Sequence, residues 1–440
     1  MLEMRDNSCF HCVIKGLSTF RFLCYNTRIM KTPVQLLIVS SLLCVTCAAA
    51  VRPDVLCIYY PEWHVYPKGE EIFGKGRTEW DFVKTAPVRF PGHQQPIVPR
   101  DGYLDDAQPA DVAKEIDYAA DAGIDVFVYD WYWADGQPIQ HEALEQGFLK
   151  APNAKRMKFA LMWAYHDRTD AFRAPIGGTA DERNPIDGKK YYWRLSHTPE
   201  EWRAAMAYCI KTYFGNPLYY LKDGKIFFSI YNANWFVRKH GGPAAAKRYL
   251  DEAQEWVKRA GLPPIHFSGM VRNADDLPEV VAAGFDSTST YCLTPYNLKD
   301  GHARMKRGEL VFPYAEFVAA HEPLNRSIAA ASSIPHIPVA VRGWDVTPRC
   351  RVEEKFPWRT LDEYPYIGLM HGATPELFKA TLEGVKRQAL DDPKRPGAIL
   401  INAWNEYTEG SYLLPDTRDG DAYLRAVREV FGTKPQHNKQ

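Results

Sequence analysis

The sequence predicts a (β/α)8 barrel, an α/β fold in which one domain carries eight parallel strands and eight helices. Two observations predict it. Between residues 55 and 432, short runs rich in β-branched and aromatic residues alternate with longer segments of helical periodicity. The strand-like runs are almost continuously apolar, as is usual in parallel strands that helices cover from outside. An open doubly wound sheet fits this pattern less well than a closed barrel.

The predicted elements follow one another in regular order. Strands are predicted at residues 55–61, 124–133, 158–167, 225–232, 265–271, 285–291, 337–345 and 398–407. Helices are predicted near residues 110–122, 199–214, 243–261, 275–283, 314–332, 373–392 and 419–432. Thr198 and Thr374 stand at capping positions, because a threonine hydroxyl can accept a hydrogen bond from a free amide of the first turn. The fifth and sixth repeats are the least clearly marked, and residues 64–103 form a long first connection, of the kind that usually has a function.

Composition limits the range of partners. The chain has 440 residues, of which 46 % are hydrophobic and 25 % charged, and its formal net charge is +0. A balanced charge gives no reason to expect nucleic acid or an anionic membrane as a partner. No run in the body of the chain reaches the roughly 20 apolar residues of a membrane span. A neutral or modestly charged substrate is therefore expected, and the sequence gives no oligomeric state.

Residues 1–50 are predicted to be an extension with a secretory signal peptide, ahead of a catalytic domain at residues 51–435. Such a signal needs a basic residue, an apolar core and a small-residue cleavage site. These are Lys31, residues 34–45 and residues 48–50. Met30 is the expected start, and the protein is expected to be secreted or periplasmic. Lipid anchoring through Cys47 is less favoured, because the residues before it match a lipoprotein signal poorly.

Neither a metal nor a cofactor is predicted. The His-Glu pairs at His141 and His321 lack the second histidine of a zinc-binding HExxH motif, and no GxSxG, GxxxxGK or GxGxxG motif occurs. Four of the nine cysteines follow the predicted signal, at Cys57, Cys209, Cys292 and Cys350. Their wide spacing favours buried free thiols, with one disulfide as the alternative.

Polar and aromatic residues gather where the predicted strands end. In a barrel this carboxyl-terminal face carries the active site. The substrate-binding candidates are Tyr59, Tyr60, His64, Trp80, Asp130, Trp131, Trp133, Trp163, His166, Tyr231, Arg342, Trp344, Asp345, Trp404, Asn405 and Tyr407. For any single residue, capping or core packing is the competing interpretation. Six such strand ends together favour one shared pocket.

Glu406 and Glu409 are the catalytic candidates. If the chain turns helically after the eighth strand, side chains three positions apart lie about 5 to 6 Å apart. This matches the carboxyl separation of retaining glycosidases better than the wider gap of inverting ones. Two such close carboxylates cannot both ionise freely, so one of them should have a raised pKa. The alternative is that one glutamate caps a helix or pairs with an arginine such as Arg342.

Several ordered motifs together resemble those of the WbsX-like proteins, whose domain is similar to glycoside hydrolase family 99. They are YYPEWH (59–64), GKGRTEW (74–80), GHQQPIVPRDGYLD (92–105), FVYDWYW (127–133), RGWDVTPR (342–349) and WNEYTEGSYLLPD (404–416). The resemblance implies a (β/α)8 barrel and a retaining glycosidase that acts on α-linked, mannose-type glycans. It also implies that Glu406 is a base on the sugar's 2-hydroxyl, giving a 1,2-anhydro sugar, and that Glu409 is the general acid and then the base.

The sequence departs from the family pattern at two places. The third-strand motif reads WAYHDRTD (163–170) where relatives usually have a form close to WANENWT, and Tyr407 stands where a tryptophan is usual. The sugar that is bound can therefore differ from the family's usual one. Two alternatives to hydrolysis stay open: a glycosyltransferase of polysaccharide synthesis, and a carbohydrate-binding barrel without catalysis.

Overall fold

The computed structural model describes residues 52–169, 191–358 and 364–432. The predicted extension and signal peptide at residues 1–50 therefore lie outside the described residues. The described residues belong to one compact unit, which begins at Val51 and contains the barrel. No helix among the described residues is both long and apolar enough to cross a membrane.

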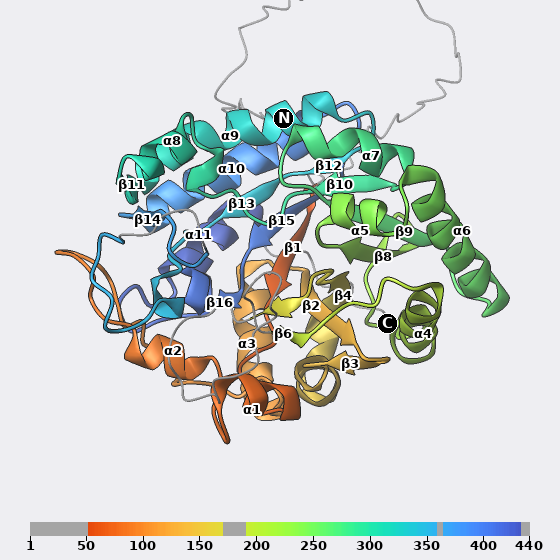
Figure 1. Ribbon diagram of the computed structural model, residues 1–440, viewed down its shortest axis with the longest axis horizontal. Coiled ribbons are helices and arrows are strands. Elements are labelled where there is room, and N and C mark those ends of the chain that lie inside the picture. Colours follow the sequence, from red (N-terminus) through yellow and green to blue (C-terminus); the bar gives the residue numbers. More distant parts are fainter. Residues whose placement is uncertain (1–51, 170–190, 359–363, 433–440) are drawn as a thin grey trace, which may run out of the picture. The chain divides into compact units, whose positions relative to one another are not determined.

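A barrel of parallel strands forms the centre of the unit (Figure 1). Its strands are β1 (Asp54–Tyr59), β2 (Val126–Ala134), β4 (Lys158–Trp163), β8 (Lys225–Ile230), β9 (Ile265–Met270), β10 (Ser287–Ser289), β12 (His336–Ile337), β13 (Val339–Val341) and β15 (Ala398–Asn402). The hydrogen-bonded order runs from β12 through β10, β9, β8, β4, β2, β1 and β15 to β13. Only Pro338 separates β12 from β13, so the two are halves of one strand that pairs with β10 on one side and β15 on the other. The eight predicted strands are confirmed, and the sheet closes on itself.

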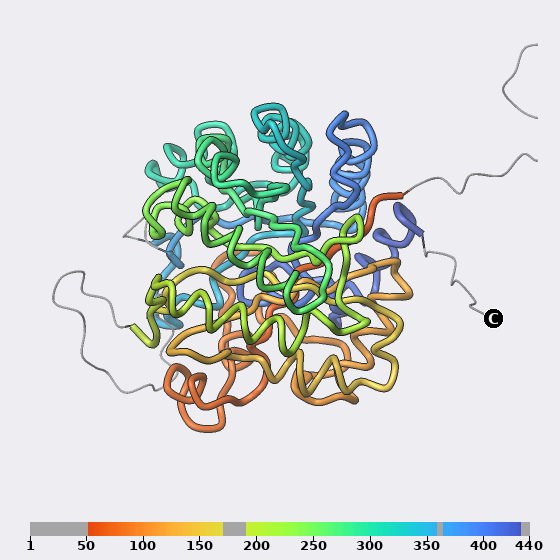
Figure 2. Tube along the Cα trace, turned by 90° about the vertical axis from the view of Figure 1, so that its right-hand side faces the viewer, coloured from red at the N-terminus to blue at the C-terminus, as the bar shows by residue number. Residues whose placement is uncertain are grey.

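Helices surround these strands. They are α3 (Pro109–Ala122), α4 (Pro199–Cys209), α5 (Ala233–Lys239), α6 (Pro243–Arg259), α7 (Leu277–Ala282), α9 (Tyr314–Ala331), α10 (Pro375–Asp391) and α11 (Ala422–Phe431). The hydroxyls of Thr198 and Thr374 accept from the amides of Glu201 and Leu377, as predicted for caps. In both views α9 and α10 lie side by side on the outside (Figures 1 and 2). Between β2 and β4 the chain makes only short π and 3-10 turns at residues 143–156.

The connections carry further short elements. These are α1 (Pro67–Phe73), α2 (Trp80–Thr85), β3 (Gln137–Ile139), β5 (Arg168–Thr169), β6 (Tyr191–Trp193), β7 (Leu221–Lys222), α8 (Gly301–Lys306), β11 (Val311–Pro313), β14 (Leu369–His371), β16 (Asn405–Glu406) and β17 (Ser411–Tyr412). The segment at 64–103 was predicted as a loop, yet it contains α1 and α2. Proline opens α1 at its first turn, where its missing amide costs nothing. Both helices bury aromatic residues, Phe73 and Trp80, so packing orders the connection.

The core has two layers, which follow from the two-residue period of a strand. Leu56 and Ile58 of β1 belong to a buried cluster with Val128 and Leu400 from neighbouring strands, inside the barrel. The alternate residues of β1 belong to a second cluster together with residues of the surrounding helices. The side of a strand on which a residue lies therefore decides whether it faces the barrel axis or the helices. Cys57, Cys209, Cys292 and Cys350 are free thiols; three of them are buried as predicted, and Cys292 is partly exposed.

Candidate active site

The two candidate glutamates leave the eighth strand on a tight turn. After β15, residues 405–406 pair with 411–412 as β16 and β17, and a 3-10 turn, η8 (Tyr407–Glu409), connects them. The predicted helical turn is thus present, although it is a single 3-10 turn. Gly410 closes it at φ +68°, and a Cβ there would lie 2.7 Å from the Asp345 amide nitrogen. Only glycine fits, because any side chain would push apart the turns that follow β13 and β15.

A single arginine, Arg349, contacts both glutamates. It ends the 3-10 turn η7 (Thr347–Arg349) that follows β13, and it is 3 % exposed. Its Nη1 lies 2.5 Å from Oε1 of Glu409, and its Nη2 lies 3.6 Å from Oε1 of Glu406. Its Nε donates to Oε1 of Glu79 at 2.9 Å, and the Thr408 hydroxyl donates to the same oxygen at 2.6 Å. The guanidinium of Arg349 therefore lies beside three carboxylates.

Glu406 is buried, and burial acts against its negative charge. Burial raises its pKa well above the usual range, and repulsion by Glu409 and Asp130 adds to the shift, while Arg349 acts in the opposite direction. The Tyr291 hydroxyl donates to Oε2 of Glu406 at 2.5 Å. One carboxyl of the pair has a raised pKa, as predicted, but it is Glu406, the residue to which the resemblance gives the role of base and not that of general acid.

Glu409 has two donors on one oxygen. Arg349 and the Tyr364 hydroxyl, at 2.7 Å, both contact Oε1. Around the pair, the Tyr231 and Tyr291 rings meet edge to face at 5.3 Å, and the His166 ring lies 5.7 Å from that of Tyr231. These three side chains are partly exposed, so they form the accessible edge of the site.

Asp130 lies on the same side of the sheet as this site. It is 5 % exposed, and its pKa is raised well above the usual range, chiefly by burial. Its strand pairs with β4 so that Asp130 is beside Met162, which belongs to the inner cluster. The structure therefore brings together Asp130, His166, Tyr231, Glu406 and Glu409 of the predicted residues.

A second buried cluster adjoins the first. The Tyr60 and Tyr66 hydroxyls each donate to Glu62, and Nη2 of Arg168 reaches Oε2 of Glu62 at 3.0 Å. The Tyr60 ring also lies 5.6 Å from the guanidinium carbon of Arg349. Tyr60, a predicted residue, thus connects the two arginine clusters.

Other predicted residues face the helices instead. Strand alternation turns Trp131 and Trp133 to the side opposite Asp130, where their rings stack at 5.5 Å. These residues, with Tyr59, Trp163 and Trp404, belong to the outer cluster. Trp163 stacks on Trp202 of α4 at 5.8 Å, and the Trp404 indole donates to Glu115 of α3 at 3.0 Å.

Arg342 also lies on that side. Its guanidinium is 4.3 Å from the Tyr412 ring and 4.1 Å from the Tyr423 ring, and 3.7 Å from an oxygen of Asp419. Glu409 does pair with an arginine, as the alternative interpretation expects, but that arginine is Arg349 and not Arg342.

The remaining predicted residues support the site's framework. The Asn405 amide exchanges two hydrogen bonds with the Tyr60 backbone, at 2.8 and 3.0 Å, which ties strand eight to strand one. Trp80 donates to the Leu104 carbonyl at 2.8 Å, and the Tyr407 hydroxyl donates to that of Leu414 at 3.3 Å. The backbone amide of Asp345 donates to the Glu409 carbonyl at 2.6 Å. Trp344 is buried in the inner cluster, and its carbonyl accepts from Met370.

His64 forms an ion pair deep in the same framework. Its Nδ1 lies 2.6 Å from Asp106 and its Nε2 lies 3.3 Å from Glu142. Burial alone would lower the pKa of His64, but the two carboxylates raise it to about 10. Both ring nitrogens are therefore engaged, and a charged His64 joins the turn after β1 to the segment after β2.

Four residues of the site were missed at the sequence level. Glu79 and Arg349 lie within the motifs quoted above, GKGRTEW and RGWDVTPR, so those motifs contained the signal. Tyr291 is the last residue of the strand predicted at residues 285–291, a position at which aromatic residues of other strands are candidates. Tyr364 has no local pattern that distinguishes it from other tyrosines.

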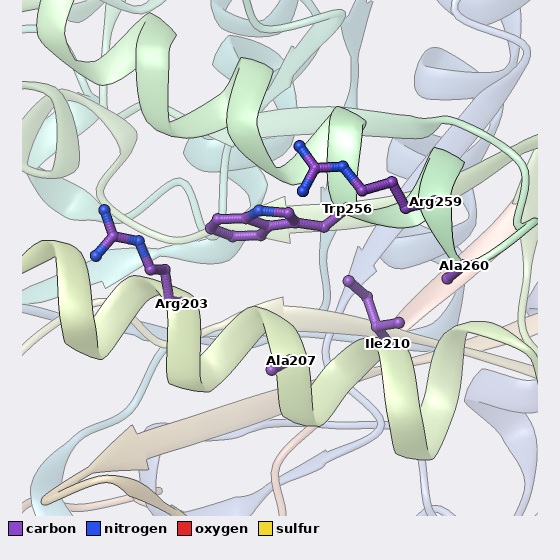
Figure 3. Close-up of a pocket in the computed structure, with 6 residues that line it drawn as sticks. All are labelled: Arg203, Ala207, Ile210, Trp256, Arg259 and Ala260. Carbon is purple, nitrogen blue, oxygen red and sulfur yellow. The ribbon is translucent and has the colours of Figure 1, made fainter.

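A separate surface pocket of about 530 Å³ lies between α4 and α6 (Figure 3). Its lining residues are Arg203, Ala207, Ile210, Trp256, Arg259 and Ala260. No carboxylate lines it, so it offers no acid and base pair. The chemistry is therefore to be sought at the glutamates.

The fold and site define a (β/α)8 barrel protein with a carboxylate-rich site at the carboxyl ends of its strands. The chain belongs to the family described as glycosyltransferase WbsX, whose model matches residues 55–427. Two curated relatives, both described as uncharacterized protein WxcX and both from Xanthomonas campestris pv. campestris, are 25 % identical over 388 residues. Those residues are 87 % of this chain, and the chain spans about half the length of these relatives, 50 %.

Solved structures share the fold. The GH99 endo-alpha-mannosidase from Bacteroides thetaiotaomicron matches with a TM-score of 0.51 and 17 % identity, over 86 % of this chain and 96 % of that chain. A structure described as a glycoside hydrolase-like protein matches with a TM-score of 0.54 and 13 % identity, over 87 % and 95 % of the two chains. At this level of identity the likeness concerns the barrel, and it agrees with the fold that the sequence predicts.

Proposed function

We propose that this protein is a retaining glycoside hydrolase that cleaves α-linked, mannose-type glycans. The observation that carries the proposal is the sharing of one buried arginine by Glu406 and Glu409 at the carboxyl ends of the barrel strands. Two acids held by one cation at this face can divide a proton between them, as acid and base catalysis of glycoside cleavage requires. The family resemblance adds the separate roles of the two acids.

The mechanism uses the sugar's own 2-hydroxyl. Glu406 takes the proton of this hydroxyl while the sugar's 2-oxygen bonds to the anomeric carbon. In the same step Glu409 gives its proton to the departing glycosidic oxygen. A 1,2-anhydro sugar and a free alcohol result. Water then attacks the anomeric carbon, Glu409 takes a proton from the water, and Glu406 returns its proton to the 2-oxygen. Two inversions at the anomeric carbon give net retention.

Contacts in the site fit these roles. Arg349 and Tyr364 both bind Oε1 of Glu409, which leaves Oε2 as the oxygen to face the glycosidic bond. Tyr231 and His166 at the accessible edge offer an aromatic surface and a ring nitrogen to a sugar. Burial lowers the pKa of His166, so it binds as a neutral ring.

The decisive experiment is a screen of the wild type, Glu409→Gln and Glu406→Gln against mannan-type and other polysaccharides. Products are identified by mass, and the anomer is read by NMR. We expect retention without added cofactor, and a loss of turnover of about a thousand-fold in each variant, while glycan binding persists. Glu429→Gln, exposed on α11, is the matched control and should behave as wild type. Release of the inverted anomer, or no product from any glycan, would refute the proposal.

A glycosyltransferase is the second candidate, because the family's own description favours it. Adding nucleotide-sugar donors to the same screen separates the two. Chain extension that depends on a donor would establish transfer, and shortening without a donor would establish hydrolysis. A carbohydrate-binding barrel without catalysis would bind glycan equally well in the wild type and in Glu409→Gln, with no turnover in either. Export of the protein, which its first 50 residues predict, would favour hydrolysis, since nucleotide sugars are scarce outside the cytoplasm.

A further inference from the structure

One hydroxyl, that of Tyr291, lies between two buried carboxyls. It is 2.5 Å from Oε2 of Glu406 and 3.3 Å from Oδ2 of Asp130. A tyrosine hydroxyl has one hydrogen, so it can donate to only one of the two oxygens at a time. If both carboxyls were ionised, the other contact would set two electron-rich oxygens against each other. A proton on one of the carboxyls would remove this repulsion and make the second contact a hydrogen bond.

The distances and partners place that proton on Asp130. The short contact to Glu406 has the length of a hydrogen bond from a hydroxyl to a charged carboxylate, whereas the contact to Asp130 is long. Glu406 also has Arg349 at 3.6 Å as a partial counter-charge. The other oxygen of Asp130, Oδ1, is buried and has no hydrogen-bond partner among the residues that the structure describes. A charge on so poorly solvated a carboxylate is costly.

The groups facing Asp130 support this assignment. Its electrostatic neighbours are Tyr132 on its own strand, Tyr231 after β8, Tyr291 after β10, Arg349 in η7, Glu406 in β16 and Glu409 in η8. Only one of them, Arg349, is a cation, and it already contacts three other carboxylates. Burial raises the pKa of Asp130, Tyr291 acts against it, and Glu409 raises it further.

We propose that Asp130 is a positioning residue that keeps a proton and donates it in a hydrogen bond to the Tyr291 oxygen. The Tyr291 hydrogen then points to Glu406, and a neutral Asp130 no longer repels the charge of Glu406, so Glu406 can ionise and act as the base. The proton on Asp130 is not consumed in the reaction, so no co-reactant is needed. The effect on catalysis rests on the proposed function, whereas the location of the proton rests only on the geometry of the three side chains.

Infrared spectroscopy tests the location of the proton directly. At pH 7 an ordinary aspartate, with a pKa of about 3.9, shows no carbonyl band of a protonated acid. We expect such a band in the wild type, shifted by ¹³C-labelled aspartate and absent from Asp130→Asn. In Tyr291→Phe the band should persist at a shifted frequency, because the acid stays protonated but loses its acceptor. Identical wild-type and Asp130→Asn spectra in this region would overturn the proposal, and thermal unfolding checks that the variants fold.

Turnover tests the positioning role. Asparagine can still donate to the Tyr291 oxygen, so Asp130→Asn should lower kcat less than about ten-fold, whereas Asp130→Ala should lower it about a hundred-fold with little change in KM. Equal damage by both substitutions would mean that Asp130 acts as a charge, and would overturn the proposal. If the wild type turns over no glycan, the proposed function fails, and the infrared result still decides where the proton lies.

Discussion

The Arg168 and Arg349 clusters are adjacent, but they differ in how many close donors each gives to its buried carboxylate. Glu62 receives three donors, from Tyr60, Tyr66 and Arg168. Glu406 receives one close hydroxyl and shares a more distant Arg349 with two other carboxylates. Burial raises the pKa of both carboxyls, and repulsion by a neighbouring glutamate, Glu79 for Glu62 and Glu409 for Glu406, raises each further. Three close donors fix Glu62 in place, whereas Glu406, with one close donor and a distant shared cation, is the carboxyl prepared to exchange protons.

The largest effect is expected from removing the shared cation. In Arg349→Met, Glu406 loses the cation that opposes its proton uptake, so it should become protonated and the base should be lost. We expect kcat/KM to fall at least about a hundred-fold. The remaining activity should shift to higher pH, since loss of a neighbouring cation raises the pKa of a carboxyl. A full pH profile on the glycan identified by the screen measures both changes. An unchanged profile would mean that the catalytic acids do not depend on the charge of Arg349.

The matched change in the other cluster should act on stability instead. Arg168→Met leaves the charge of Glu62 buried and without its cation, which typically costs about 3 to 5 kcal/mol. Urea unfolding measures this loss. The folded fraction should keep far more activity than Arg349→Met does. If Arg168→Met abolished turnover without loss of stability, Glu62 would belong to the catalytic group.

Glu115 is a third buried carboxyl, and among the described residues no arginine contacts it. Burial raises its pKa from 4.5 to about 8, and the Trp404 indole donates to it at 3.0 Å. A raised pKa in the folded state means that its contribution to stability is full below about 4.5 and is lost as the pH rises through about 8. The free energy of unfolding should fall over this window, on the order of a few kcal/mol.

Glu115→Gln should remove that fall, because a neutral amide does not titrate. Urea unfolding at several pH values compares it with the wild type and with Glu383→Gln, an exposed glutamate on α10. If Glu115→Gln and the wild type lost stability in parallel between pH 5 and pH 8, other groups would be responsible.

The sequence predicted the barrel and the position of Glu406 and Glu409 because both depend on local signals, an apolar run followed by acids. It grouped Asp130 with Trp131 and Trp133, although strand alternation places them on opposite sides of β2. It also suggested Arg342 as the partner of a glutamate. Which arginine reaches the pair depends on the turn after β13, and no residue spacing specifies that turn. Tyr364 reaches Glu409 only through tertiary structure, so no local pattern could identify it.

The smallest effect tests how closely Glu409 depends on its two donors. Tyr364→Phe removes one hydrogen bond to Oε1 and leaves Arg349 in place. A hydrogen bond to a charged group contributes about 1.5 kcal/mol, so kcat should fall about ten-fold with little change in stability. Tyr366→Phe is the matched control, because the Tyr366 hydroxyl accepts from the Arg351 amide. If Tyr364→Phe reduced kcat as strongly as Arg349→Met, the hydroxyl of Tyr364 would control the proton of Glu409, and the contrast between the two arginines would explain only part of the site.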